Sequence, residues 1–409
     1  MADASRTRPL AILGRFLRFG LLAFGGPVAQ IAMLRRELVD EEGWVTSDRF
    51  NRLLAVYQVL PGPEAHELAV HMGLLRGGRL GAVLAGLGFM LPGFVLMLAI
   101  SWLYFQVDIT AASIGAALLG AQVAVIALVT RAVERLGRHI LVDPGPWLIA
   151  LAAAAATVAG VSFWITLPVA GAAYALAGRL PRAVVYGAVV AIAFAALAWS
   201  ATTHGLALLE PGAGPVGPGA GGAIEATPLA VFLSGLKAGL LTFGGAYTAI
   251  PFIRGDAVGN GWLTDTQFLD GLALGSILPA PLIIFGTFVG YVAGGPIGAV
   301  AMTAGIFLPA FSFALVLGDR IERVVDNPAL HRVLEGVAAG VVGLIAVTAL
   351  QLGGAVATRL PALLPGVVIF GASLALLLLW KSRAAVPLTI AGAALAGWLA
   401  FSGLAFGGS

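Results

Sequence analysis

The sequence predicts an all-α integral membrane protein made of two homologous helical halves, arranged as an inverted repeat with broken, re-entrant helices. The first observation is composition: 59% of the 409 residues are hydrophobic, 11% are charged, and the mean hydropathy is +0.98. A soluble domain has about 25% charged residues. The second observation is a series of apolar runs long enough for a helix to cross a bilayer, such as 80–98, 114–130 and 365–380. The third is an internal repeat. The alternating pattern of a membrane β-barrel is absent, so helices are the predicted spanning elements.

Composition also excludes several classes of site. The chain has no Cys, which rules out disulfides, thiolate metal sites and Cys nucleophiles. Its pI of about 9.5 is attributed to arginines at membrane ends, so nucleic-acid binding is not expected. The polar first nine residues and the positions of Arg15 and Arg18 argue against a cleavable signal peptide. No Gly-x-x-x-x-Gly-Lys-Ser/Thr motif occurs, so direct drive by ATP is unsupported, and no cofactor or metal is expected.

The internal repeat divides the chain into a first repeat at 1–204 and a second at 228–409, separated by a Gly/Pro-rich linker at 205–227. Ordered matches join the two halves at offsets of 217 to 219 residues. They pair Phe24-Gly25-Gly26 with Phe243-Gly244-Gly245, GWVTSDRF with GWLTDTQF, VLPGP with ILPAP, RLGAV with PIGAV, and LPGF with LPAF. The match fades after about residue 105. We infer that the gene was duplicated.

The arginines suggest how the elements cross the membrane. If the Phe-Gly-Gly and Pro-Gly-Pro segments each enter and return on one side as broken hairpins, the basic residues of the first half all lie inside. Five crossings then follow, near 80–105, 109–132, 146–160, 162–178 and 183–204. Residues 10–79 carry eight Lys or Arg, whereas the matched 229–296 carry two, which favours an inverted repeat. Drift of loop charge after duplication is the alternative, and other segmentations of 146–205 remain open.

Three stretches carry a family resemblance: FGGPVAQIAMLRRELVDEEGW, LPGPEAHELAVHMG and TFGGAYTAIPFI followed by GWLT. They resemble the long-chain, two-domain form of the chromate transporter family, over both halves. The resemblance implies a secondary transporter that exports chromate, a tetrahedral dianion, across the bacterial inner membrane and is coupled to protons or a counter-anion. Two departures are Ala280, where the first half has Gly62, and the PGPEAHEL variant of its motif.

Alternative functions remain open beside this resemblance. Sulfate shares the shape and charge of chromate, so a sulfate or other oxyanion carrier is the first alternative. A membrane-embedded enzyme would need a nucleophile–base pair or a metal site, and neither is evident; a gated channel is a third alternative. The expected partners are chromate or a similar oxyanion and the lipid bilayer, without nucleic acid, and a homodimer is one oligomeric state to consider.

The broken helices are the candidate substrate site. A Gly pair lets the backbone leave the helix, Pro27 suits the first turn of a restarted helix, and such a helix start attracts anions. We expect both breaks to meet near the bilayer midplane, with Arg35, Arg254 and Lys237 as cations. The predicted binding residues are Phe24, Gly25, Gly26, Pro27, Arg35, Pro61, Gly62, Pro63, Lys237, Phe243, Gly244, Gly245, Arg254, Pro279 and Pro281. The alternatives are close helix packing for Gly, kinks for Pro, interfacial anchoring for Arg35 and snorkelling for Lys237.

A titratable cluster follows the Pro-Gly-Pro break: Glu64, His66, Glu67 and His71. A zinc-protease helix needs its His residues four apart on one face, but these two are five apart, so that assignment fails. Carboxylates inside a membrane are costly unless protonated or paired, so these four residues are the proton-coupling candidates, and Glu64 is the one expected to carry the coupled proton. The alternative is a solvated cluster at the cytosolic interface.

Four further residues are expected to serve structure. Trp44 and Trp262 are predicted interface anchors, and Thr46 and Thr264 are predicted to cap the helices that follow them. Asp270 and Glu335 are expected near a membrane interface.

Overall fold

The computed structural model describes residues 8–108, 112–203, 224–243, 245–318 and 327–402, and these residues form helices and no strand. Both terminal tails and most of the predicted 205–227 linker lie outside them. The helices of the first half are α1 (Pro9–Leu21), α2 (Gly26–Leu34), the π-helical η1 (Arg35–Glu41), α3 (Ser47–Val59), α4 (Glu64–Tyr104), α5 (Ala112–Ile140), α6 (Pro144–Val158), α7 (Phe163–Leu176) and α8 (Arg182–Thr203). Those of the second half are α9 (Pro228–Leu240), η3 (Ala246–Ala249), α10 (Ile250–Ala257), α11 (Asp265–Ile277), η4 (Leu282–Ile284), α12 (Phe285–Ser312), η5 (Phe313–Leu317), α14 (Pro328–Ala357), α15 (Leu363–Leu379) and α16 (Ala385–Phe401).

The two halves repeat the same local conformation. The φ/ψ angles of Gly77 and Gly78 are −132°/15° and 62°/−157°, and those of Gly294 and Gly295 are −153°/28° and 62°/−154°. Glycine is required at Gly78 and Gly295 because other residues rarely adopt a positive φ. The predicted two homologous halves are therefore confirmed, in the backbone as well as in the sequence.

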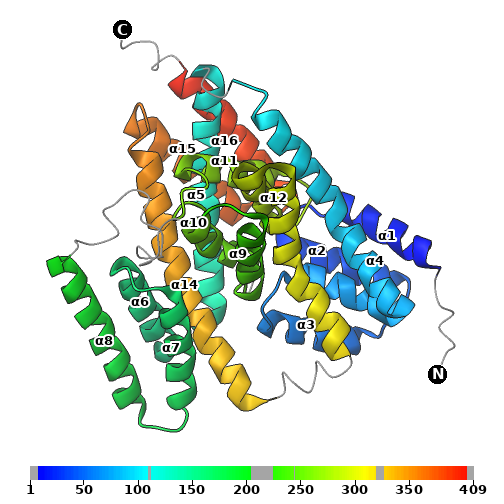
Figure 1. The fold of residues 1–409 in the computed structure, drawn as a ribbon, viewed down its shortest axis with the longest axis horizontal. Coiled ribbons are helices and arrows are strands. Elements are labelled where there is room, and N and C mark those ends of the chain that lie inside the picture. Colours follow the sequence, from blue (N-terminus) through cyan, green and yellow to red (C-terminus); the bar gives the residue numbers. More distant parts are fainter. Residues whose placement is uncertain (1–7, 109–111, 204–223, 244, 319–326, 403–409) are drawn as a thin grey trace.

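These glycines turn α4 and α12 back on themselves. A Cβ on Gly73 would lie 2.4 Å from the carbonyl oxygen of Gly81, and one on Gly290 would lie 2.3 Å from that of Gly298. Residues eight apart are about 12 Å apart along a straight helix, so each of these helices is a hairpin of two segments. The hairpins α4 and α12 pack against each other and join the two halves (Figure 1).

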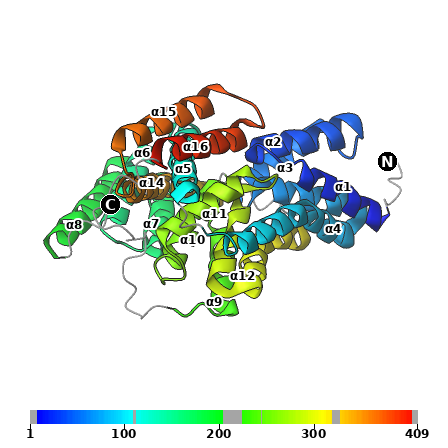
Figure 2. The same cartoon turned by 90° about the horizontal axis from the view of Figure 1, so that it is seen from above.

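Two long helices, α5 and α14, form the centre of the molecule. They pack on each other, and α15 and α16 cover α5 along one side (Figure 2). The helices α6 and α7 pack on α14, and α8 packs outside α6. Within the described part of the chain, five helical segments are long and apolar enough to cross a membrane: α4, α5, α8, the η4–α12–η5 segment and α14.

The predicted helix caps are confirmed. The Thr46 hydroxyl accepts a hydrogen bond from the Arg49 N–H at 3.3 Å, and Thr264 forms a full capping box with Gln267. Asp270, expected near a membrane interface, is 1% exposed, and its carboxylate accepts hydrogen bonds from Tyr104 and Gln122 inside the protein. The distance from Tyr104 Oη to Asp270 Oδ2 is 2.8 Å, so this contact also joins the two halves.

Inversion of the repeats predicts that matched loops lie on opposite sides of the membrane. The chain has no Cys, so single Cys residues at positions 49 and 260 can be labelled cleanly. We expect an impermeant maleimide to label position 260 from the periplasmic side and position 49 only from the cytoplasmic side. Labelling of both positions from the same side would contradict the inverted arrangement.

Candidate functional site

A cavity of about 400 Å³ lies where the broken helices of both halves meet. The first break supplies Pro27 from the start of α2, and the Pro-Gly-Pro break supplies Glu64 from the start of α4. The second half supplies Phe243 and Gly245. The remaining walls of the cavity come mainly from α5 and α14. One cavity therefore collects four of the predicted site residues from three separate breaks.

Backbone hydrogen bonds hold these breaks together. The Gly62 N–H donates to the Thr242 carbonyl at 2.8 Å, which joins the Pro-Gly-Pro break of one half to the Phe-Gly-Gly break of the other. Within the second break, the Thr248 hydroxyl accepts from the Phe243 N–H at 2.9 Å and donates to the Gly245 carbonyl at 2.8 Å. In the first break, the Gln30 amide donates to the Ala23 carbonyl at 2.8 Å. The irregular backbone is thus supported from within the protein, as it must be at membrane depth.

The glycines next to the cavity have left-handed backbone conformations. The φ of Gly25 is 90° and that of Gly26 is 76°, and Gly245 has a φ of 123°. Gly244 lies outside the described residues. Because α2 and α4 begin beside the cavity, an anion there would lie near the starts of both helices. In α4 the His66 and Glu67 N–H groups already donate to the Pro63 carbonyl, and Pro27 of α2 has no N–H, so the donors left are the earliest N–H groups of each helix.

The charged lining comes from α5 and α14 as well as from the breaks. Arg135 is exposed in the cavity wall and lies close enough to Glu64 and Tyr247 to act on both electrostatically. On α14, His331 and Glu335 form an ion pair at 3.1 Å when the imidazole is protonated. His139 also lines the cavity. With neutral histidines and ionised carboxyl groups, the lining carries one positive charge, on Arg135, and two negative charges, on Glu64 and Glu335.

Only Glu64 of the titratable cluster faces the cavity. His66 is buried, contacts the Gly86 carbonyl at 3.0 Å through Nε2 and lies 4.7 Å from the Phe307 ring centre. The alternative of a solvated cluster is wrong, because all four side chains are buried. His71 contacts the Tyr57 hydroxyl at 2.8 Å.

Glu67 is the most isolated member of that cluster. Its carboxylate is 0% exposed, and neither oxygen has a hydrogen-bond partner within the described part of the chain. A Cβ on Gly62 would lie 2.3 Å from its Oε1, so Gly62 leaves the space that this carboxyl group fills. Glu67 therefore packs against the back of the break and does not line the cavity.

The three predicted substrate cations lie outside the cavity and bind protein groups, which corrects their assignment. Arg254 is 0% exposed, and its guanidinium donates to both oxygens of Asp265 at 2.7 and 3.0 Å and to Gln351 at 2.9 Å. Lys237 pairs with Asp256, and its ammonium lies 5.0 Å from the Phe163 ring centre. Arg35 donates to Asn51 at 3.2 Å. Arg254 and Lys237 are paired with carboxylates of neighbouring segments, whereas Arg35 contacts a neutral amide, and none of the three lines the cavity.

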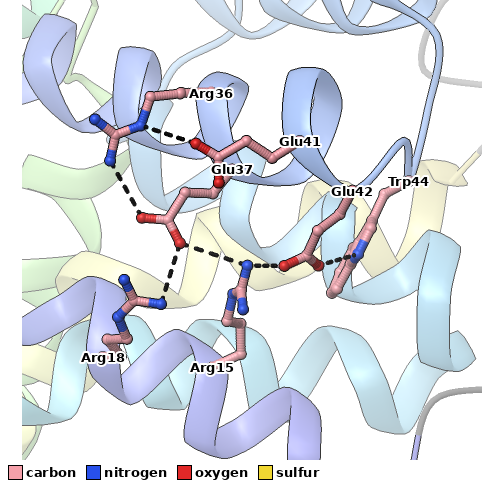
Figure 3. A network of polar contacts seen from close by, with 7 residues as sticks. All are labelled: Arg15, Arg18, Arg36, Glu37, Glu41, Glu42 and Trp44. Atoms are coloured by element: carbon pink, nitrogen blue, oxygen red, sulfur yellow. Dashed lines mark hydrogen bonds and ion pairs between the residues drawn. The ribbon is translucent and has the colours of Figure 1, made fainter.

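The Lys237–Asp256 pair has a counterpart in the first half. Arg18 and Glu37 lie 219 positions earlier, and they form an ion pair at 3.4 Å. Glu37 also contacts Arg15 at 3.4 Å and Arg36 at 3.5 Å, as Figure 3 shows. In each half this pair ties the first helix of the broken hairpin to the helix after the break.

The other predicted residues surround the cavity without lining it. Phe24 lines a different pocket, and Gly25 packs against the backbone of Arg383. Pro61 and Pro63 flank Gly62 before α4. The Pro279-Ala280-Pro281 break packs against α4, since a Cβ on Gly93 would lie 2.5 Å from that of Ala280.

The main residue that sequence reasoning missed is Arg135. Arg131, Arg135 and His139 recur every four residues on α5, which places two guanidinium groups and an imidazole on one helix face. That spacing is the signal in the sequence that indicates a cationic wall.

Comparisons with known proteins agree on one family. The family model described as chromate transporter matches residues 10–179 and 229–398, one match for each half. A chromate transport protein of Pseudomonas aeruginosa is 60% identical over 395 residues, which cover 95% of this chain and 92% of that protein. A chromate transport protein of Cupriavidus metallidurans is 31% identical over 396 residues, covering 94% of this chain and 92% of that protein. A probable chromate transport protein of Synechococcus elongatus is 29% identical, covering 95% and 94%. No solved structure matches the chain.

Proposed function

The chain belongs to the chromate transporter family, and we propose that it is a secondary transporter that exports chromate through the cavity between its two halves. We place it in the inner membrane of a bacterial cell, as a multi-pass protein. The observation that carries the proposal is the meeting of breaks from both halves at one cavity, with Pro27 and Glu64 on one side and Gly245 on the other. The cavity is complete within one chain, so its chemistry does not require a dimer.

The lining suits a tetrahedral oxyanion. Helix starts and left-handed glycines can offer several backbone N–H donors, which bind an anion without adding much side-chain charge. Arg135 adds a guanidinium group, which carries a positive charge and several N–H donors, to the lining. The Phe243 ring and the apolar side chains of Val28 and Ile31 form the remaining surface near the breaks.

The charge of chromate can itself drive export. Moving one elementary charge through 100 mV is worth about 2.3 kcal/mol, so a dianion gains roughly 4.6 kcal/mol when it leaves a cell that is negative inside. Since about 1.4 kcal/mol corresponds to a factor of ten, this gain supports roughly a thousandfold gradient when the dianion leaves alone. A proton that leaves with each dianion reduces the net charge moved to one and the gain to roughly 2.3 kcal/mol. A nucleotide site is therefore not needed for export.

Transport into inside-out vesicles tests this function. We expect labelled chromate to accumulate when a potassium gradient and valinomycin make the lumen positive, and to accumulate less without a potential. Labelled sulfate tests the alternative substrate in the same vesicles, because it has the same shape and charge. Uptake of sulfate without uptake of chromate would show that sulfate, and not chromate, is the substrate. Uptake of neither anion would refute oxyanion transport.

Glu64 is proposed to take up the proton that accompanies the anion. An ionised Glu64 would repel a dianion in the same cavity, whereas a protonated Glu64 would not. His139, His331, Glu335, Tyr174 and Tyr247 are the other titratable groups in the cavity wall, beside Arg135.

The variant Glu64→Gln is expected to bind the anion but to lose the dependence of flux on the pH gradient. Gln keeps the size of the side chain and removes its titration. If the protein carries sulfate, the flux would be measured with sulfate, because the charge of sulfate is constant over this pH range. The matched control is Glu67→Gln, which changes a buried carboxyl group outside the cavity and should leave the pH dependence in place. Unchanged pH dependence in Glu64→Gln would mean that Glu64 carries no proton during transport.

A further inference from the structure

A second pocket, of about 410 Å³, lies beside the Phe24-Gly25-Gly26 break and is separate from the transport cavity. The end of α1 supplies Arg18 and Leu22, η1 supplies Arg36 and Glu37, and the start of α16 with the loop before it supplies Arg383 and Leu388. The pocket therefore joins the N-terminal broken hairpin to the last two helices of the chain. The transport mechanism makes no use of it.

The charges in this pocket favour an anion. Three guanidinium groups face it and only one carboxylate does, and that carboxylate is buried among arginines, as Figure 3 shows. Glu37 already contacts Arg15, Arg18 and Arg36, so it is satisfied without any other cation. Arg383 is exposed, and no hydrogen bond or ion pair of its side chain is found among the residues that the structure describes.

The position of the pocket favours a lipid over a free ion. Arg383 lies in the short loop between the apolar helices α15 and α16, and this loop begins with Trp380 and Lys381. Trp and Lys at the end of an apolar helix mark the depth of the lipid headgroups. The apolar rim of the pocket is open, with Leu22 44% exposed and Leu388 53% exposed. An acyl chain can cover this rim, and a free ion cannot.

We propose that this pocket binds the phosphate headgroup of an anionic phospholipid, with Arg18, Arg36 and Arg383 as its cationic wall. Basic pockets between membrane helices on the cytoplasmic side are suited to such headgroups. The binding has a direct structural consequence for the first break, because a Cβ on Gly25 would lie only 2.9 Å from the Arg383 Cα. A headgroup that holds the Arg383 loop in place also holds the backbone of the break that forms one wall of the transport cavity.

Thermal unfolding in nanodiscs tests the proposal without any transport assay. The wild-type chain is measured in phosphatidylcholine alone and in phosphatidylcholine with added phosphatidylglycerol. We expect phosphatidylglycerol to raise the apparent Tm by about 2–4 °C, because a ligand that binds only the folded state stabilises it. Arg383→Gln should keep the Tm of the wild type in phosphatidylcholine and lose most of the rise. Native mass spectrometry should show about tenfold less retained phosphatidylglycerol for this variant.

Two controls make the outcome decisive. Lys381→Gln removes the same charge from the same loop but does not line the pocket, so it should keep the full response to phosphatidylglycerol. Inorganic phosphate is added to the phosphatidylcholine sample to distinguish a free anion from a lipid. An equal response of Arg383→Gln and the wild type would overturn the site, and full stabilisation by inorganic phosphate would overturn the lipid as its ligand.

Discussion

Arg135→Gln is expected to lower chromate affinity by roughly 10- to 100-fold, because a charge-assisted hydrogen bond contributes about 1.5–3 kcal/mol. Arg135 is the one guanidinium among the described residues that line the transport cavity, and it lies near both Glu64 and Tyr247. Loss of this charge also leaves the carboxylates of the lining uncompensated. Chromate affinity would be measured on purified, monodisperse protein.

The matched control for this prediction is Arg138→Gln. Arg138 lies on the same helix and pairs with Glu134, but its side chain is 78% exposed and does not line the cavity. An exposed ion pair contributes roughly 0–1 kcal/mol, so its loss should leave chromate affinity unchanged. If Arg135→Gln bound chromate like the wild type, the cationic wall of α5 would have no part in substrate binding.

Gly26→Ala and Gly245→Ala are expected to weaken chromate binding by roughly tenfold each, with a smaller loss of folded protein. A Cβ at either position meets no atom within 4 Å, so neither substitution introduces a clash. The φ angles of 76° and 123° disfavour Ala by about 1 kcal/mol or more. Relaxing this strain turns the neighbouring N–H groups away from the cavity, and the effect should appear in both halves.

Gly43→Ala and Gly261→Ala are the controls for backbone strain. Their φ angles are 62° and 71°, and a Cβ at these positions also meets open space. Both glycines lie in connections away from the cavity, so their variants should lose stability to a similar degree and keep wild-type affinity. Equal affinity in all four variants would mean that the glycines of the breaks do not shape the substrate site.

The helix breaks and caps could be predicted because their causes are local. Gly and Pro set φ or remove a donor at their own positions, and a Thr before a helix bonds within three residues. This is why the breaks at Gly25 and Gly62 and the caps at Thr46 and Thr264 lie where the sequence predicts them. The duplication added further support, because each feature occurs twice at nearly one offset.

The partners of the cations could not be predicted in the same way. In the sequence, Lys237 and Arg254 look like substrate ligands. In the folded protein they form ion pairs with Asp256 and Asp265. One signal was present, since the 19-residue spacing of Lys237 and Asp256 is also that of Arg18 and Glu37. That repetition of opposite charges indicates a structural ion pair in each half.

Tertiary contacts between the halves explain the remaining differences between the predictions from sequence and the structure. Asp270 looks like an interface residue by its position in α11, but Tyr104 and Gln122 approach it from other helices and bury it. Arg135 enters the site only because α5 packs beside the breaks. Neither contact follows from local sequence, because each depends on how α4 and α5 pack against the second half.

The most direct test of the shared cavity is the position of chromium in crystals grown with chromate, measured by anomalous scattering at the chromium absorption edge. We expect one strong peak in the cavity, within reach of Arg135 and the backbone of Gly26 and Gly245. A strong peak beside Arg35, Lys237 or Arg254, with none in the cavity, would contradict it.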